Sequence, residues 1–150
     1  MKILICCLLI TGLLIGTSTY VGEVVVDNKQ NIEIKYVDVV ENLDKTAYVE
    51  VDGDDYFGIA LSVLNTIGIV DNCIKGVTVE KSIVIVDFIL DCCVLHSGTA
   101  VELAILDSLA MTFVESLGFE NIIFRVDGKP YESGHIAFGL NEKYYWGALC

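Results

Sequence analysis

Apolar and polar positions alternate along the first part of the chain. In residues 31–40 the apolar Ile32, Ile34 and Tyr36 are separated by polar neighbours, and residues 46–52 repeat this spacing. A period of two places successive side chains on opposite faces, which is typical of a half-buried β-strand. The polar stretch between them is typical of a turn, so the pattern predicts two successive strands.

The spacing becomes helical after this second strand. Residues 56–67 place apolar side chains three or four positions apart, which predicts an amphipathic helix. These side chains are Phe57, Ala60, Leu61, Leu64 and Ile67. Asp54 or Asp55 is expected to cap the amino end, where a carboxylate accepts hydrogen bonds from free backbone N–H groups. Gly68 is expected to end the helix.

A hairpin is predicted next. Val77 and Val79 alternate with polar residues, Lys81-Ser82 supplies the turn, and residues 83–86 are apolar without interruption. A continuous apolar run is typical of a strand that is covered on both faces. The second strand of the hairpin is therefore expected to be central in its sheet.

A longer helix is predicted over residues 100–117. One stripe of this helix is apolar, whereas Glu102, Asp107 and Glu115 fall off the stripe. The stripe consists of Leu103, Leu106, Leu109, Ala110, Phe113 and Leu117.

The last predicted strand, residues 121–126, precedes a turn at Asp127-Gly128, and Pro130 is expected to end the pairing. Arg125 stands between two apolar neighbours, so alternation points its side chain to the solvent side. The element order is strand, strand, helix, hairpin, helix, strand. This order predicts an α+β fold, a two-layer sandwich with two helices packed on one face of a small mixed β-sheet.

The amino terminus has the pattern of an export signal. Lys2 precedes an uncharged apolar run of 14 residues, from Ile3 to Gly16. This length suits a signal peptide better than a membrane span, and cleavage is expected after Ser18. We therefore predict a signal peptide or membrane anchor in residues 1–18, an irregular lead in residues 19–30, and an extracytoplasmic protein that meets the membrane only through this segment.

The charge of the chain limits its partners. Lys and Arg number 9 against 21 Asp and Glu, which gives a net charge of −12 at pH 7. Such an acidic surface repels phosphate, which excludes nucleic acid as a ligand and disfavours anionic lipid. The expected partners are proteins, cations or neutral polymers, and an oligomer stays open.

Export would leave four cysteines in the mature chain, Cys73, Cys92, Cys93 and Cys150. They allow two disulfides in three connectivities. A domain of this size does not need disulfides, and the adjacent Cys92 and Cys93 cannot easily bridge each other.

The segment DCCVLH is the sharpest candidate for chemistry. Cys92 and Cys93 stand four and three residues before His96, so on a helix either thiol shares a face with the imidazole, with Asp91 nearby. A thiolate and an imidazole form a nucleophile pair, or two ligands of a metal ion. The alternative function is therefore an envelope hydrolase, cysteine-dependent or metal-dependent, that uses Cys92, Cys93 and His96.

Further ligands for such a site are far away in the sequence. A zinc site needs three or four protein ligands, and the remaining candidates are Cys73, His135 and Cys150. We therefore predict no catalytic, metal or cofactor-binding residues, and we interpret the two adjacent cysteines as small buried hydrophobes on a loop.

Two further motifs have structural explanations. VDGDD, residues 51–55, resembles part of a calcium loop but lacks the spaced glutamate at its end, so the start of a helix explains it better. The tripeptide Ser97-Gly98-Thr99 lacks the G-x-S-x-G surroundings of a hydrolase nucleophile. Ser97 or Thr99 is expected to cap the second helix instead.

The order of elements, with the motifs inside it, resembles the GerMN domain, a domain of sporulation and spore germination proteins. The hairpin VTVEKSIVIVDF, residues 77–88, is similar to the family pattern V-x-V-x-(DG)-x-x-x-V-D-F. Residues 97–130 are similar to the family's long helix with its A-L-x-x-T-L run and to the closing strand that ends in V-D-G-K-P. The helix FGIALSVLNTIG agrees more weakly. On this resemblance we place the GerMN-like domain in residues 31–130.

The resemblance implies a non-enzymatic protein, exported or membrane-anchored, that acts in spore formation or germination. The fold of this family is related to ring-building domains of the sporulation machinery, and it carries no catalytic residues to transfer. The resemblance therefore implies an assembly or docking module in the cell envelope, with an envelope or sporulation protein as its partner.

Residues 131–150 form a C-terminal extension that has no counterpart in that family. Its aromatic residues are Phe138, Tyr144, Tyr145 and Trp146. We expect them to add to the edge of the sheet, to present a surface for a protein or glycan, or to pack on the core.

Overall fold

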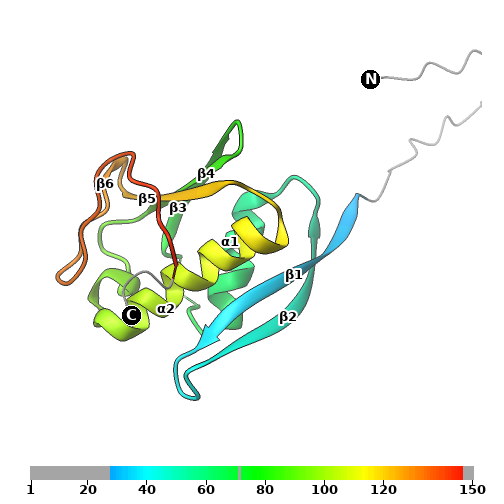
Figure 1. The fold of residues 1–150 in the computed structure, drawn as a ribbon, viewed down its shortest axis with the longest axis horizontal. Coiled ribbons are helices and arrows are strands. Elements are labelled where there is room, and N and C mark those ends of the chain that lie inside the picture. Colours follow the sequence, from blue (N-terminus) through cyan, green and yellow to red (C-terminus); the bar gives the residue numbers. More distant parts are fainter. Residues whose placement is uncertain (1–27, 71, 147–150) are drawn as a thin grey trace, which may run out of the picture.

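A computed structural model describes residues 28–70 and 72–146. The predicted signal segment 1–18, most of the predicted lead and Cys150 lie outside the described residues. The described residues form an α+β fold with six strands and two α-helices (Figure 1). In chain order the elements are β1 (Lys29–Asp38), β2 (Leu43–Asp52), α1 (Tyr56–Thr66), β3 (Ile74–Glu80), β4 (Ile83–Phe88), the 3₁₀-helix η1 (Cys93–His96), α2 (Thr99–Ala110), the π-helical turn η2 (Met111–Ser116), β5 (Asn121–Val126) and β6 (Lys129–Pro130). The predicted order of elements is confirmed.

The larger sheet has the order β3-β4-β5-β6 and is mixed. β4 pairs antiparallel with β3 and parallel with β5, so it is a central strand, as its apolar run predicts. Val84, Val86 and Phe88 of β4 enter the core on one face, beside Ile122 and Phe124 of β5. Helix residues fill the other side of this core, which gives the expected packing of helices against one face of the sheet.

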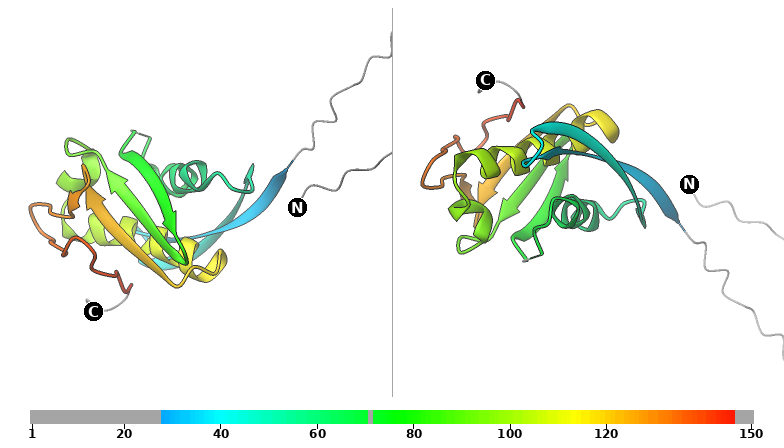
Figure 2. Two further views of the ribbon diagram at one scale, coloured as in Figure 1. Left: turned by 90° about the horizontal axis from the view of Figure 1, so that it is seen from above. Right: turned by 90° about the horizontal axis from the view of Figure 1, so that it is seen from below.

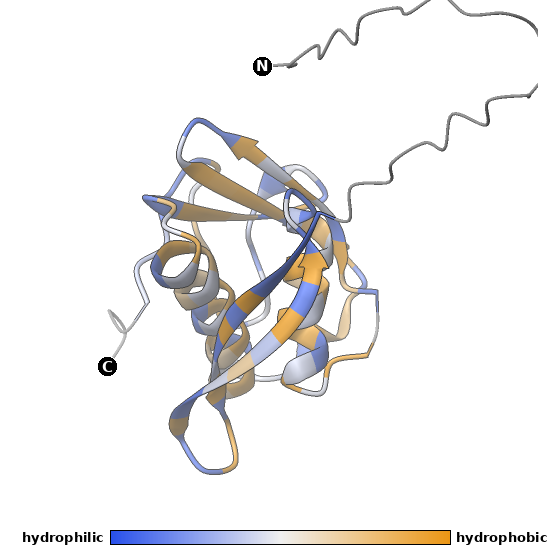
Figure 3. Ribbon diagram, turned by 90° about the vertical axis from the view of Figure 1, so that its right-hand side faces the viewer, coloured by the Kyte–Doolittle hydropathy of each residue, from blue (hydrophilic) through white to orange (hydrophobic). Residues whose placement is uncertain are grey.

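The first two strands form a sheet of their own, which the sequence pattern does not separate from the larger one. β1 and β2 pair antiparallel over their whole length, from Lys29 opposite Asp52 to Asp38 opposite Leu43. This hairpin runs between the two helices, and alternating hydrophobic and hydrophilic positions are visible along it (Figure 3). Its Lys29 end extends beyond the body of the molecule (Figure 2). β1 begins within the predicted irregular lead, because strand pairing continues past the apolar alternation.

The caps of the two helices differ. At the amino end of α1, Asp55 Oδ1 accepts from the Gly58 N–H at 2.8 Å, which confirms the expected cap. At α2 the cap position is Gly98, with a φ of 85° and no side-chain cap, so the prediction of Ser97 or Thr99 is wrong. The Ser97 hydroxyl is engaged elsewhere, since it donates to the Val94 carbonyl of η1 at 2.7 Å.

The C-terminal extension packs back onto the sheet. Tyr144 forms an isolated antiparallel bridge with Ile122 and is buried, whereas Tyr145 is exposed. The Tyr144 ring lies 5.1 Å from Phe124 and 5.4 Å from Phe138, centroid to centroid. Core packing is therefore the main role of Phe138 and Tyr144, and within the described residues a single isolated bridge, from Tyr144 to Ile122, joins the extension to a strand.

A short strand that the sequence pattern does not predict follows β5. The turn at Asp127-Gly128 returns the chain as β6, and the pairing ends at Pro130, the last residue of that strand, as expected. Arg125 does point away from the core, but its partners are in the extension. Its Nε donates to the Leu140 carbonyl at 3.3 Å and its Nη2 to Asn141 Oδ1 at 3.0 Å.

Candidate functional site

The outer edge of β1 is closed by hydroxyl groups of the long helix. Thr112 Oγ1 accepts from the Lys35 N–H at 3.1 Å and donates to the Lys35 carbonyl at 3.0 Å. Ser108 Oγ accepts from the Val37 N–H at 3.0 Å. Because the backbone groups of Lys35 and the N–H of Val37 point to the helix, this part of β1 has no edge to offer to another strand.

The opposite edge of the hairpin is open. Lys35 stands opposite Thr46 and its backbone groups point away from β2, so Thr46 in turn points its N–H and C=O away from β1. Since the strand has a period of two, Tyr48 and Glu50 do the same. Among the described residues no strand pairs with this side of β2. We call this side of β2, from Asp44 to Asp52, the hairpin edge.

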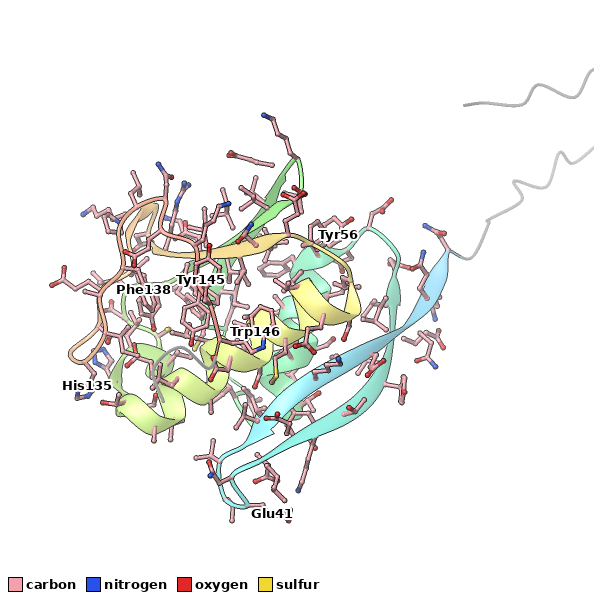
Figure 4. The ribbon with its side chains drawn as sticks, viewed as in Figure 1. Glu41, Tyr56, His135, Phe138, Tyr145 and Trp146 are labelled. Carbon is pink, nitrogen blue, oxygen red and sulfur yellow. The ribbon has the colours of Figure 1, made fainter. Side chains whose placement is uncertain are left out.

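An apolar patch lies at the turn that joins the two strands. Val39, Val40 and Leu43 form this tip patch, and Val40 and Leu43 are 95% and 58% exposed. Asp38 shapes the turn, because its Oδ1 accepts from the N–H groups of Val40 and Glu41 at 2.9 and 3.1 Å. Glu41 is visible at this tip in Figure 4. A shallow groove of about 200 Å³ runs from the tip patch to Ile67 at the end of α1.

Lysine neutralises part of the charge around the tip. Lys45 Nζ lies 2.6 Å from Asp38 Oδ2 and 2.9 Å from Glu41 Oε2. These hydrogen bonds raise the pKa of Lys45, and the bond from Lys45 lowers the pKa of Asp38. Lys45 and Asp38 therefore both stay charged at neutral pH.

The region around the hairpin edge is acidic. Residues 28–70 hold eight carboxylates against three lysines, a net charge of −5. Each lysine has a carboxylate partner: Lys29 pairs with Glu50, Lys35 with Glu115, and Lys45 with the tip. Asp44 and Asp52, at the two ends of the hairpin edge, are exposed and take part in no ion pair among the described residues. An incoming basic segment would therefore meet net negative charge, of which only Asp52 is partly offset, by attraction to Lys29.

The structure separates the two adjacent cysteines of the DCCVLH segment. Cys92 is buried and Cys93 is exposed, so the expectation of two buried thiols holds only for Cys92. Cys73, which is 20 residues earlier in the chain, is brought to this place, with its Sγ 3.4 Å from Cys93 Sγ. Burial is the main cause that raises the pKa of the Cys92 thiol to about 12, and the neighbouring Cys73 adds to it.

The histidines are not assembled with these thiols. His96 is exposed at the end of η1, and within the described part of the chain nothing hydrogen-bonds to its imidazole. His135 lies in the C-terminal extension, at the periphery of the molecule (Figure 4). Across residues 28–70 and 72–146, no three His, Cys, Asp or Glu side chains are grouped as a metal ion requires.

A buried carboxylate was missed by the sequence pattern. Glu102 is 0% exposed, although helical spacing puts it off the apolar stripe. The Tyr131 hydroxyl donates to Glu102 Oε1 at 2.7 Å, whereas Glu102 Oε2 is buried without a hydrogen-bond partner. Tyr144 makes a parallel contact, with its hydroxyl 2.8 Å from Asp107 Oδ1. No sequence signal marks these pairs, because each joins α2 to the C-terminal extension.

No protein-family model, curated protein or solved structure matches the chain. Within residues 28–70 and 72–146, no helix has the length and apolar character needed to cross a membrane.

Proposed function

We propose that this protein is a non-enzymatic docking module of the cell envelope, which binds an extended basic segment of a partner protein along the hairpin edge. The observation that carries the proposal is the open side of β2, a ten-residue strand whose outward backbone groups pair with no strand in residues 28–70 and 72–146. Extended peptides bind such edges by adding a strand, with main-chain hydrogen bonds supplying affinity.

Charge and shape select the partner. A basic segment would place its cations opposite Asp44 and Asp52, and it would leave the existing lysine pairs intact. An apolar side chain at one end of the segment would reach the tip patch and the groove beside Ile67. A second copy of this chain fits less well, because its own hairpin edge would bring carboxylates against carboxylates.

The envelope location rests on the apolar run behind Lys2 and on the motifs that resemble the GerMN family. We propose export with cleavage after Ser18 or retention as an anchor. Mass spectrometry of the protein from an envelope fraction is expected to find an amino terminus at Thr19 or at Met1. Full-length protein confined to the cytosol would contradict export.

The hydrolase alternative receives no support from the geometry. Cys92 is buried with a raised pKa, and among the thiols that the structure describes none is hydrogen-bonded to the His96 imidazole. A nucleophilic thiol requires an adjacent base or a lowered pKa.

Binding to the hairpin edge is tested with a basic strand-forming probe. The probe is a ten-residue peptide that alternates Lys and Val, and the matched peptide alternates Glu and Val. We expect the full chain to bind the Lys peptide and not the Glu peptide. Amide hydrogen exchange is expected to slow at Thr46, Tyr48 and Glu50, whose N–H groups face outward, and to change little at Ala47 and Val49, which already pair with β1.

Two substitutions at one position separate the backbone from the side chain. Thr46→Pro removes an outward N–H and leaves the β1 pairing intact, because proline is tolerated on edge strands. We expect about a tenfold loss of affinity, which corresponds to one hydrogen bond of about 1.4 kcal/mol. Thr46→Val keeps the N–H and is expected to bind within about twofold of the wild type. Equal binding by both variants, or protection at another surface, would refute the docking site.

A further inference from the structure

The chain after β4 stays beside the residue that precedes β3 and then turns. The Ile89 N–H donates to the Cys73 carbonyl at 2.9 Å, and the Cys92 N–H donates to the Ile89 carbonyl at 3.1 Å. This turn carries Cys93, the first residue of η1, onto Cys73, which directly precedes β3. The two sulfur atoms are 3.4 Å apart, within contact distance of each other. A disulfide bond of about 2.05 Å requires only a small further approach.

The three thiols near the start of η1 differ in their exposure to solvent. Cys93 is exposed, whereas Cys73 and Cys92 are buried. A thiol reacts as the thiolate, and burial keeps Cys92 protonated at neutral pH. Cys93 is therefore the sulfur that a soluble oxidant reaches. Cys73 is the sulfur that lies close enough to attack Cys93 afterwards.

We propose that Cys73 and Cys93 are a redox-active pair that forms an intramolecular disulfide on exposure to a small-molecule disulfide such as oxidised glutathione. The Cys93 thiolate attacks one sulfur of the small disulfide, forms a mixed disulfide and releases one small thiolate. Cys73 then loses its proton and attacks the Cys93 sulfur, which releases the second small thiolate. Two protein thiols are oxidised, and one small disulfide is reduced to two small thiols.

The bond would tie the first residue of η1 to the residue before β3. It would close a loop between positions 20 apart in the chain, at the end of the four-stranded sheet and just before α2. Closing a loop of this length restricts the unfolded chain. We expect the oxidised protein to unfold at a temperature about 10 °C higher than the reduced protein. An oxidising envelope would therefore hold the domain in its more stable form.

The test uses the full chain, reduced and then equilibrated with oxidised glutathione. Trypsin separates residues 46–75, which hold Cys73, from residues 82–125, which hold Cys92 and Cys93. We expect these two peptides to be linked in the wild type, with a mass about 2 Da below their sum. Because Cys92 and Cys93 share a peptide, the matched variants Cys93→Ser and Cys92→Ala assign the bond. The link is expected to persist in Cys92→Ala and to disappear in Cys93→Ser.

A third variant checks the order of the steps. In Cys73→Ala the mixed disulfide cannot be resolved, so a glutathione adduct is expected to accumulate on residues 82–125 and to be absent after Cys93→Ser is added. The proposal is overturned if the wild type shows no link between the two peptides. It is equally overturned if the link survives in Cys93→Ser and vanishes in Cys92→Ala, because the bond would then run through Cys92.

Discussion

At the level of the residue, Glu102 is buried although it lies off the apolar stripe of its helix. The pattern places it off the one stripe of α2 that is continuously apolar. In the structure α2 is also covered by the C-terminal extension, which brings the Tyr131 hydroxyl to its carboxylate. The helical spacing of apolar residues predicts one contact face, and it carries no information about a second face covered by a distant segment.

Removal of the Tyr131 hydroxyl tests the cost of this buried carboxylate. Tyr131→Phe leaves both oxygens of Glu102 without a partner, and we expect a loss of about 1–3 kcal/mol in the free energy of unfolding. Adding Glu102→Met, which removes the stranded acceptor, is expected to recover part of that loss. Urea denaturation measures both variants. Tyr145→Phe, at an exposed tyrosine, serves as control and is expected to stay within about 0.5 kcal/mol of the wild type.

Buried groups with raised pKa values predict how stability responds to alkaline pH. Burial raises the pKa of Cys92 to about 12, and burial followed by the hydrogen bond to Glu102 raises the pKa of Tyr131. The folded protein keeps protons that the unfolded chain releases above about pH 8.5 at cysteine and about pH 10 at tyrosine. Stability is therefore complete below these values and falls as the pH rises, by about 1.4 kcal/mol per pH unit for each group.

The cysteine part of this response can be isolated. Between pH 9 and pH 10, Cys92→Ala is expected to flatten the fall of the unfolding free energy by about 1.4 kcal/mol per pH unit, because only its titration has been removed. Tyr145→Phe is the control and should keep the wild-type slope. Parallel slopes for wild type and Cys92→Ala would show that the thiol ionises alike in both states.

At the level of the element, the hairpin is positioned by hydroxyl groups rather than by strand pairing. Thr112 and Ser108 bind the outer edge of β1, and Thr112 lies where the helix widens, with the Leu117 N–H bonded to its carbonyl at 3.1 Å. Threonine and serine in an apolar helix give no sequence signal for this contact. The sequence therefore predicts both strands of the hairpin but not that they form a separate sheet.

Thr112→Val tests this attachment at nearly constant volume. The change leaves the Lys35 N–H and C=O without partners in a partly buried place, so we expect a loss of about 1–3 kcal/mol. Hydrogen exchange is expected to accelerate at Lys35 and Val37 more than in β4. Thr46→Val, an exposed threonine on β2, is the control. Unchanged protection of β1 in Thr112→Val would mean that side-chain packing alone holds the hairpin.

Across the whole molecule, apolar periodicity predicts the element order and the central place of β4, and the aspartates before the first helix predict its cap. It fails where the outcome depends on segments far apart in the chain, as for Cys73 meeting Cys93 or Arg125 meeting Leu140. The candidate docking site could be predicted from the sequence only in part. The alternation along β2 is present in the sequence, but its open edge follows only from the closure of β1 by the helix.

The charge distribution makes a prediction about the rate of association. Asp44 and Asp52 stand at the ends of the hairpin edge within an acidic region, so they should attract the alternating Lys–Val peptide before contact is made. Raising the ionic strength from 20 to 300 mM shortens the screening length from about 20 Å to about 6 Å. We expect the association rate to fall about tenfold over this range, with a smaller change in the dissociation rate.

Paired substitutions assign this effect to the hairpin edge. Asp44→Asn with Asp52→Asn is expected to reduce the fall in association rate to about threefold, because the attraction is local. Glu80→Gln with Glu132→Gln removes the same total charge from β3 and from the C-terminal extension, and it is expected to keep most of the tenfold fall. Stopped-flow fluorescence with a labelled peptide measures each rate. If both double variants weaken the salt dependence equally, net charge rather than the charge at the hairpin edge steers binding, and the peptide has no preferred approach to β2.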